Sequence, residues 1–269
     1  MEITCITAMS KEYYDRIGKV MIDSWLKTWP TNYSLHVYSE DIESLTEDVK
    51  LINIHNICDP DLQSYLDYIG NHRSRVFTYK VYSFIHAARN NTGWILWIDA
   101  DSACIKGPDK QFVNKMFVNN TICSYMGTTM YKDKNGWKDR KNCDSAIISF
   151  NTETVDSKKF VNEFERLYNS RDIDNRSVFP KPNDTHAFIH CINFVDTQSI
   201  NINENQLALS PTNECVGDYF RHFKAGRKNK DKIAGLVDKL ISSTKKLDGK
   251  NLKKRIDRVE RRYRNDMSK

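Results

Sequence analysis

The sequence predicts an α/β fold in which helices flank a mixed, mostly parallel sheet, followed by a basic helical extension. Residues 3–9 read as a strand, and a helix-spaced apolar pattern and a second strand, 34–38, come after it. This βαβ order is typical of a Rossmann-like half. Farther along, residues 94–98 are all apolar, as in a parallel strand that is covered on both faces.

Composition sets the broad class. With 269 residues, 39% of them hydrophobic and 11% aromatic, the chain is long enough for one large α/β domain. We expect no membrane-spanning segment, because no stretch approaches ~20 apolar residues, and no signal peptide, because residues 1–5 read directly as a strand. Seven scattered cysteines, an odd number, indicate reduced thiols and a cytoplasmic location.

Charge divides the chain into two parts. Residues 224–269 hold 17 Lys and Arg against 6 Asp and Glu, a net of +11, whereas the rest holds 24 against 29, a net of −5. We expect one enzyme domain over residues 1–228 and a basic helical extension over 229–269. The predicted last helix, 251–264, has a dense cationic face. That face is either solvated or docks peripherally on an anionic membrane surface, an acidic glycan or nucleic acid.

Two carboxylates, Asp99 and Asp101, directly follow the apolar strand. In an open α/β sheet, ligands gather at the carboxyl ends of strands, and residues two apart in an extended chain point the same way. Adjacent carboxylates repel each other unless a cation lies nearby, and hard divalent ions prefer oxygen ligands. The pattern predicts a metal site, although a strand that runs into a polar turn has the same spacing.

Two helices are predicted before the apolar strand, at residues 59–70 and 73–89. Arg73, Arg75 and Lys80 lie on or near the N-terminal half of the second helix. They form either a solvated basic face or a set of ligands for substrate phosphates. No glycine-rich dinucleotide or phosphate-binding motif occurs in the chain, so classical dinucleotide-binding and ATPase functions lose support.

The second half of the chain continues the alternation of strands and helices. The predicted segments are a strand at 121–126, a polar loop at 131–141, a strand at 144–151, helices at 156–169 and 186–194, short strands near 198–209, and a helix at 230–241.

Several short motifs occur in a recognisable order. They are the apolar strand with Asp99 and Asp101, the helix with Lys80, residues 142–151 ending in Phe-Asn, Asn183-Asp184-Thr185-His186, and His222-Phe223 followed by Gly226 and Lys228. Together they resemble the GT-A class of nucleotide-sugar glycosyltransferases, and within it the family-eight type of glycogenin and the lipopolysaccharide galactosyltransferases. The resemblance covers residues 1–228. It departs from the family pattern at Gly226, one place late, and at Asn229, where the family has Pro.

The resemblance implies a transferase. It would move a sugar, with retention of the anomeric configuration, from a nucleotide-diphosphate sugar to a glycan or other hydroxyl acceptor. A UDP-sugar is the implied donor. The implied cofactor is Mn²⁺ or Mg²⁺, held by Asp99, Asp101 and His222. A histidine ligand favours Mn²⁺, because imidazole suits transition metals better.

The resemblance also implies roles around the donor. For Asp184, a helix N-cap is the simpler interpretation, since Asp is a preferred residue there. The implied donor-binding residues are Thr7, Ala8, Tyr14, Lys80, Asp99 and Lys228, and the implied catalytic residues are Asp144 and Asp184.

Three other functions stay open. His186 and His190, four apart on a predicted helix with Cys191 adjacent, suggest a zinc hydrolase, but the usual Glu is missing. A metal-dependent nucleotidyltransferase would use the same kind of sheet, but normally with a glycine-rich loop after the first strand. The basic extension fits a non-enzymatic polyanion-binding protein.

Overall fold

The computed structural model describes residues 1–57, 60–70, 75–117, 122–133, 136–175, 184–195, 200–201, 219–223 and 230–244. Seven strands form one sheet: β1 (Ile3–Ala8), β2 (Ser34–Ser39), β3 (Val49–Asn53), β4 (Trp94–Ile98), β6 (Ile122–Asp133), β7 (Gly136–Asn151) and β8 (Ile200–Asn201). Their order is β3-β2-β1-β4-β7-β6-β8. The first four run parallel, β7 is antiparallel to β4 and β6, and β8 is parallel to β6. The predicted mixed, mostly parallel sheet is confirmed.

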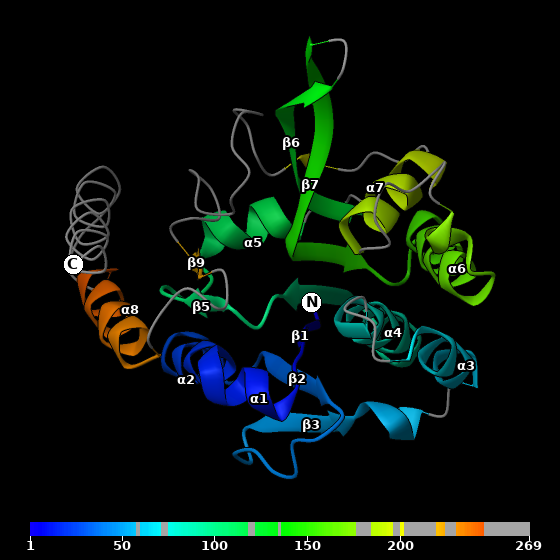
Figure 1. Cartoon of the computed structure of the whole chain (residues 1–269). Helices are drawn as coiled ribbons and strands as arrows, with labels where there is room; N and C mark the ends of the chain where they lie inside the picture. The colour runs from blue at the N-terminus through cyan, green and yellow to red at the C-terminus, as the bar shows by residue number, and fades with distance from the viewer. Residues whose placement is uncertain are drawn as a thin grey trace.

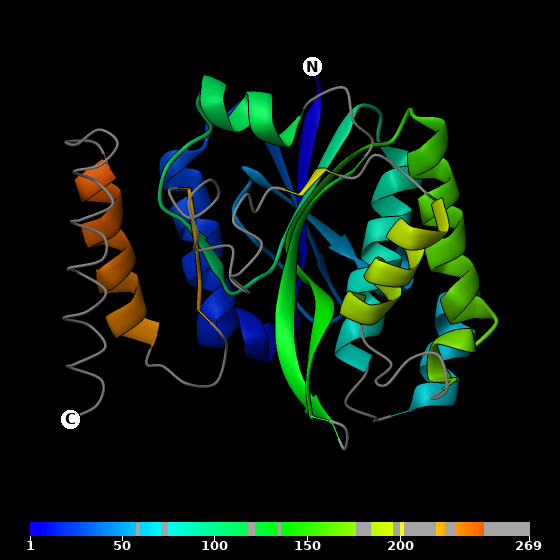
Figure 2. The same cartoon turned by 90° about the horizontal axis from the view of Figure 1, so that it is seen from above.

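Helices cover both faces of the sheet, as Figure 2 shows. They are α2 (Lys19–Thr28), α3 (Pro60–Ile69), α4 (Arg75–Asn90), α5 (Lys110–Met116), α6 (Val155–Asn169) and α7 (Asp184–Val195). Ile95 and Trp97 of β4 belong to the core under α3, α4, α6 and α7. Trp94, Leu96 and Ile98 belong to the opposite core with α2 and α5. The strand is apolar throughout because both faces are buried. None of the described helices is long and apolar enough to cross a membrane.

The helical segment after β1 changes its winding. It starts with the single turn α1 (Lys11–Tyr13), where the Ser10 hydroxyl accepts a hydrogen bond from the Tyr13 amide at 3.2 Å. A π-helical turn, Tyr14–Gly18, follows before α2. Gly18 lies against Met9: a Cβ at Gly18 would be 2.3 Å from the Met9 sulfur. Because a π turn holds more residues than an α-helical turn, the side chain that faces the site is not the one that a 3.6-residue spacing predicts.

Strands β6 and β7 correct one prediction. Of the segment 131–141, which the sequence predicts as a polar loop, residues 131–133 and 136–141 are described, and they do not form a loop. They lie within a long two-stranded ribbon, paired from Tyr125 opposite Asp144 to Asp133 opposite Gly136. The ribbon projects beyond the rest of the sheet in Figure 1. A β-bulge separates it from the sheet, because Ser124 pairs with Ile148 while the next residue pairs with Asp144. Such a bulge bends the strand and redirects nearby side chains.

A second, small sheet lies beside the first. It pairs β5 (Ser102–Cys104) with β9 (Phe220–His222) in antiparallel register. Helix α8 (Lys230–Thr244) packs against α2 on its outer side (Figures 1 and 2). The helix predicted at 230–241 is thus confirmed. The helix predicted at 251–264 lies outside the described residues, as do most of the strands predicted near 198–209.

Candidate active site

The two carboxylates predicted after β4 lie in a tight turn rather than on a longer strand. The Asp99 amide donates to the Ala146 carbonyl at 2.8 Å, which ties the end of β4 to β7. The Ser102 amide then donates to the Asp99 carbonyl at 2.9 Å and closes the turn. Asp101 is almost fully buried, whereas Asp99 is partly exposed. The turn brings both side chains to the same rim of the sheet.

Pairing between β5 and β9 adds a histidine to these carboxylates. Ser102 stands opposite His222 in the register, and the Phe223 amide donates to the Asp101 carbonyl at 2.7 Å. The His222 Nε2 lies 3.0 Å from Asp101 Oδ1. Ligand atoms of Asp99, Asp101 and His222 all lie within 4.8 Å of one another. Two carboxylates and one imidazole at this separation fit a divalent transition-metal ion.

Tyr13 approaches this group from the N-terminal helical segment. Its hydroxyl hydrogen-bonds Asp101. Burial raises the pKa of Tyr13, and the charges of Asp101 and Asp99 raise it further. The phenol therefore stays protonated and donates to the carboxylate, so it orients the Asp101 side chain.

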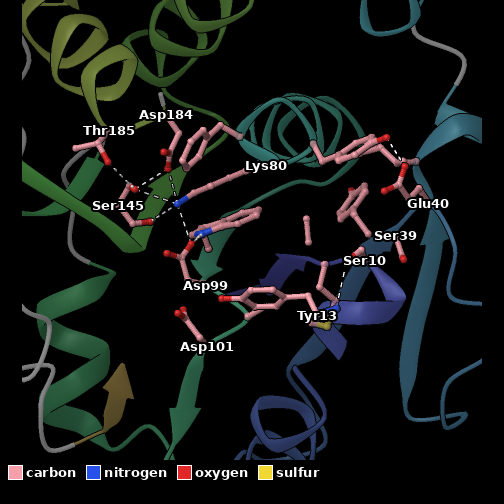
Figure 3. A pocket seen from close by; sticks show the side chains of 18 of the residues that line it. Ser10, Tyr13, Ser39, Glu40, Lys80, Asp99, Asp101, Ser145, Asp184 and Thr185 are labelled. Carbon is pink, nitrogen blue, oxygen red and sulfur yellow. Dashed lines mark hydrogen bonds and ion pairs between the residues drawn. The ribbon is translucent and has the colours of Figure 1, made fainter. Parts of the chain in front are cut away.

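Lys80 lies at the centre of a second cluster (Figure 3). Its ammonium is 2.8 Å from Asp99 Oδ1 and 2.7 Å from Asp184 Oδ2, and it donates to the Ser145 carbonyl at 2.8 Å. It also lies 5.0 Å from the centre of the Trp97 ring. Burial opposes the charge on Lys80, but Asp184 and Asp99 outweigh burial and raise its pKa. The ammonium is therefore a fixed positive charge between two carboxylates.

The pKa values of the two carboxylates around Lys80 are shifted in opposite directions. Burial raises the pKa of Asp184, but Lys80, the Ser145 hydroxyl and the Thr185 amide outweigh it and leave the pKa lowered. The Ser145 hydroxyl donates to Asp184 Oδ2 at 2.6 Å. Burial raises the pKa of Asp99, and the neighbouring Asp101 adds to that rise. Asp184 is thus a stable anion. The positive charge around Asp99 does not offset its burial and the nearby Asp101, as expected of a carboxylate that binds a cation.

Both clusters line one cavity of about 430 Å³ at the carboxyl ends of β1, β2 and β4. At its other end, the Tyr79 hydroxyl donates to Glu40, which directly follows β2. Figure 3 shows Glu40 and Ser39 across the cavity from Lys80 and Asp184. Phe77, Ile54 and Tyr38 add apolar wall. The cavity therefore has a carboxylate at one end and the Asp99–Asp101–His222 group with Lys80 at the other.

The structure brings most of the predicted site residues to this cavity: Ala8, Lys80, Asp99, Asp101, Asp184 and His222 line it. Thr7 is buried within β1 and does not line it. Tyr14 does not line it either, while its neighbour Tyr13 does. Asp144 pairs with Tyr125 in the ribbon, but its side chain lies outside the described part of the structure, as does the whole of Lys228.

The histidines behind the zinc-hydrolase alternative lie elsewhere. His190 Nε2 is 3.2 Å from Glu163 Oε1, so it pairs with a carboxylate between α6 and α7. Cys191 is fully buried in the core. In the described part of the chain, Asp99, Asp101 and His222 are the one group of three with metal-ligating spacing.

Sequence reasoning missed four contributors to the site: Tyr13, Trp97, Glu40 and Ser145. Glu40 had a usable signal, because it directly follows the second strand of a parallel sheet, where ligands gather. Ser145 stands beside Asp144 in a stretch already singled out. Tyr13 had no such signal, since the π turn that follows it cannot be predicted from the spacing of apolar residues in the sequence.

Compared by sequence, the chain matches no protein-family model and no curated protein. Solved structures with a similar arrangement include mouse xyloside xylosyltransferase 1, at 11% identity and a TM-score of 0.44 over 79% of this chain and 86% of that one. A glycosyltransferase involved in glycosylation of the major capsid of PBCV-1 has 13% identity and a TM-score of 0.44 over 89% of this chain and 100% of that one. The bifunctional glycosyltransferase WbbM has 10% identity and a TM-score of 0.40 over 76% of this chain, which spans 46% of WbbM. Likenesses this distant decide nothing about the chemistry, which rests on the side chains of the cavity.

Proposed function

We propose that this protein is a glycosyltransferase that moves a sugar from a nucleotide-diphosphate sugar to a hydroxyl of a glycan or other acceptor. The observation that carries the proposal is the placement of Asp99, Asp101 and His222 beside the Lys80–Asp184 pair in one cavity. A diphosphate carries concentrated negative charge, and this end of the cavity offers a fixed ammonium and ligands for a cation. The sequence resemblance favours a UDP-sugar as donor and retention of configuration.

Asp99, Asp101 and His222 would hold Mn²⁺ or Mg²⁺, and the imidazole favours Mn²⁺. When bound, such an ion neutralises charge on the leaving diphosphate as a Lewis acid. Hydrogen bonds within the protein orient both carboxylates: Tyr13 donates to Asp101, and Trp97 Nε1 donates to Asp99 Oδ1 at 2.6 Å. Lys228, by the same resemblance, would contact the phosphates.

Asp184 is suited to bind sugar hydroxyls. It stays ionised beside Lys80, and a carboxylate accepts hydrogen bonds from adjacent hydroxyls. The Ser145 hydroxyl holds Asp184 Oδ2 in place. We assign Asp184, together with Asp144 at the start of the bulge, to the transferred sugar or the acceptor. The charged Lys80 keeps Asp184 from taking up a proton during the reaction.

The nucleoside would occupy the other end of the cavity. Ala8, at the end of β1, lines the cavity, whereas Thr7 and Tyr14, which the resemblance also implies, do not line it. Glu40, oriented by Tyr79, offers a carboxylate that accepts hydrogen bonds from a ribose or a base. The apolar wall near Ile54 suits an aromatic base.

A ligand screen tests this function. Thermal melting is measured with UDP-, GDP- and ADP-sugars, with and without Mn²⁺, next to nucleoside triphosphates and short nucleic acids. We expect one nucleotide-sugar to raise the melting temperature only together with Mn²⁺, and the same pair to show slow hydrolysis or transfer to added sugars. Stabilisation by triphosphates alone would favour a nucleotidyltransferase instead, and retention of nucleic acid without any nucleotide-sugar response would contradict an enzyme of this class.

A further inference from the structure

Helix α8 packs on a hydrophobic cluster that is separate from the two cores of the large sheet. We call it the α8 cluster. Five of its residues come from α8, and the other five come from the segment before α2, from α2, from β5 and the residue after it, and from the residue after β9. Its members are Ile17, Val20, Ala103, Ile105, Phe223, Ile233, Leu236, Val237, Leu240 and Ile241.

The α8 cluster includes or contacts two residues that adjoin the candidate metal group. Phe223 belongs to the cluster and directly follows His222. Tyr13 packs against the cluster and hydrogen-bonds Asp101. The cluster therefore contacts the supports of two of the three candidate ligands, although none of its own members lines the cavity.

Strand β9 is held on two sides: Phe220 is fully buried in the core with α2 and α5, and Phe223, directly after the strand, is buried in the α8 cluster. The strand pairs with β5 over only three residues. The Ile105 amide donates to the Tyr219 carbonyl at 2.8 Å, and the Phe223 amide donates to the Asp101 carbonyl at 2.7 Å. These backbone bonds and the burial of Phe220 hold the start of β9. The other end, next to His222, is held by the burial of Phe223 between the segment that leads into α2 and helix α8.

Helix α8 is itself fastened to the same region. The Thr244 hydroxyl donates to the Ile105 carbonyl at 3.0 Å, and Lys27 Nζ lies 2.8 Å from Asp238 Oδ1. Leu240 and Val237 are buried in the α8 cluster. The helix thus closes over β5 and β9 from outside the fold.

We propose that α8 is a positioning element for the metal group: by burying Phe223 and bracing Tyr13, it holds His222 and Asp101 at ligating distance. The proposal rests on the proposed function, because it assigns the same three residues to a divalent ion. It also means that the enzyme domain does not end at residue 228, since the first helix of the extension completes its metal site.

The test uses the full chain with Leu240→Ala, matched to Leu167→Ala in α6. Both leucines are almost fully buried, but Leu167 belongs to the core on the other side of the sheet. Mn²⁺ binding is titrated by electron paramagnetic resonance, and hydrogen exchange of residues 219–223 is followed without metal. We expect Leu240→Ala to weaken Mn²⁺ binding about 10-fold, the lower bound for loss of groups that support metal ligands, and to speed exchange of the Phe223 amide. Leu167→Ala should change neither.

The milder Ile241→Val serves if Leu240→Ala does not fold, and it should shift both readouts in the same direction by a smaller factor. Folded α8 variants with wild-type Mn²⁺ affinity and wild-type exchange of β9 would overturn the proposal. If the wild type itself takes up no Mn²⁺, the metal assignment fails, and the exchange of β9 alone then decides whether α8 positions His222.

Discussion

Lys80 and Asp184 form a buried ion pair, with Nζ 2.7 Å from Oδ2 and only 14% and 6% of the two side chains exposed. Two charges in such a place contribute little net stability, because desolvation offsets their attraction. Removing one partner is different, since it leaves the other charge without compensation. The pair therefore makes the base of the cavity sensitive to single substitutions.

Lys80→Met should destabilise the protein by about 3–5 kcal/mol, because Asp184 is then left as an uncompensated buried carboxylate. Urea unfolding at neutral pH measures the loss. The double variant Lys80→Met/Asp184→Asn should recover part of the stability, since the stranded charge is gone. Equal stability of wild type and Lys80→Met would show that the pair is not buried as described.

Asp101→Asn should lower transfer at saturating Mn²⁺ by at least about 100-fold, the upper range for perturbed metal sites, while far-ultraviolet circular dichroism stays unchanged. Asn keeps the shape of Asp101 but loses the charge that a cation needs. Asp99→Asn and chelation of the metal should have the same effect. Asp23→Asn, which removes an exposed partner of Lys19, is the control and should leave turnover unchanged. Normal turnover of the Asp99→Asn/Asp101→Asn double variant would rule out the site.

Glu40→Gln should weaken binding of the preferred nucleoside diphosphate by about 10-fold, since a hydrogen bond to a charged group contributes roughly 1.5–3 kcal/mol. Inorganic pyrophosphate should bind equally well to both proteins, because it lacks the nucleoside that would reach Glu40. Calorimetric titration of both ligands makes the comparison. Tyr79→Phe, which removes only the donor that orients Glu40, should have a smaller effect in the same direction. Parallel losses for nucleotide and pyrophosphate would place Glu40 elsewhere in the mechanism.

Asp109 should stabilise the protein in a pH-dependent way. Partial burial raises the pKa of Asp109, but hydrogen bonds from Lys106, Tyr219 and the Phe112 amide outweigh it and hold the pKa at about 2. A carboxyl with a lowered folded-state pKa stabilises the fold above its unfolded pKa of about 3.9. That contribution disappears as the pH falls toward 2. Because Asp109 is partly exposed, we expect it to amount to about 1 kcal/mol or less.

Asn caps helices about as well as Asp, so Asp109→Asn isolates the charge. Its melting temperature should lie about 2 °C below that of the wild type at pH 6. The gap should narrow steadily between pH 4 and pH 2.5. A gap that is constant over this range would mean that the hydrogen bonds, rather than the ionised carboxylate, stabilise the start of α5.

Residues 245–269 lie outside the described structure, and the prediction for them comes from the sequence. Deleting them should leave transfer to a small acceptor unchanged and reduce retention on anionic liposomes at low salt. Each Lys or Arg near an anionic surface contributes about 1 kcal/mol, and salt screens it. Co-sedimentation at two salt concentrations measures the effect. Equal retention of the full-length and shortened proteins would mean that the basic face is simply solvated.

The sequence predicted the centre of the fold well, because burial leaves a strong pattern there. Strand β4 is apolar at every position since both its faces are covered, and Asp99 marks its carboxyl end. Lys80 was found through the helix that leads into that strand. His222 lies more than 120 residues from Asp99, and no local pattern links them; only the resemblance suggested it, and the pairing of β5 with β9 brings it in.

What the sequence did not predict lacks a periodic signal. Residues 131–133 and 136–141 at the far end of the β6–β7 ribbon are mostly polar and show no apolar alternation, so the sequence predicts a loop there, whereas backbone pairing makes them strand. A π turn decides that Tyr13, rather than Tyr14, lines the cavity, and its wider winding cannot be predicted from the spacing of apolar residues. Strands as short as β5 carry too few residues for any pattern.

The bulge in β7 separates a part of the strand pair whose length can vary from the part that holds Ser145 in the cavity. Residues 145–147 lie between the pairs Ser124–Ile148 and Tyr125–Asp144, so the ribbon keeps a register of its own. Its arms can lengthen or shorten together without shifting Ser145 or the strand pairs beyond it. An exchange of the ribbon with that of a relative should therefore leave Ser145 in place, with its contacts to Lys80 and Asp184 in the cavity.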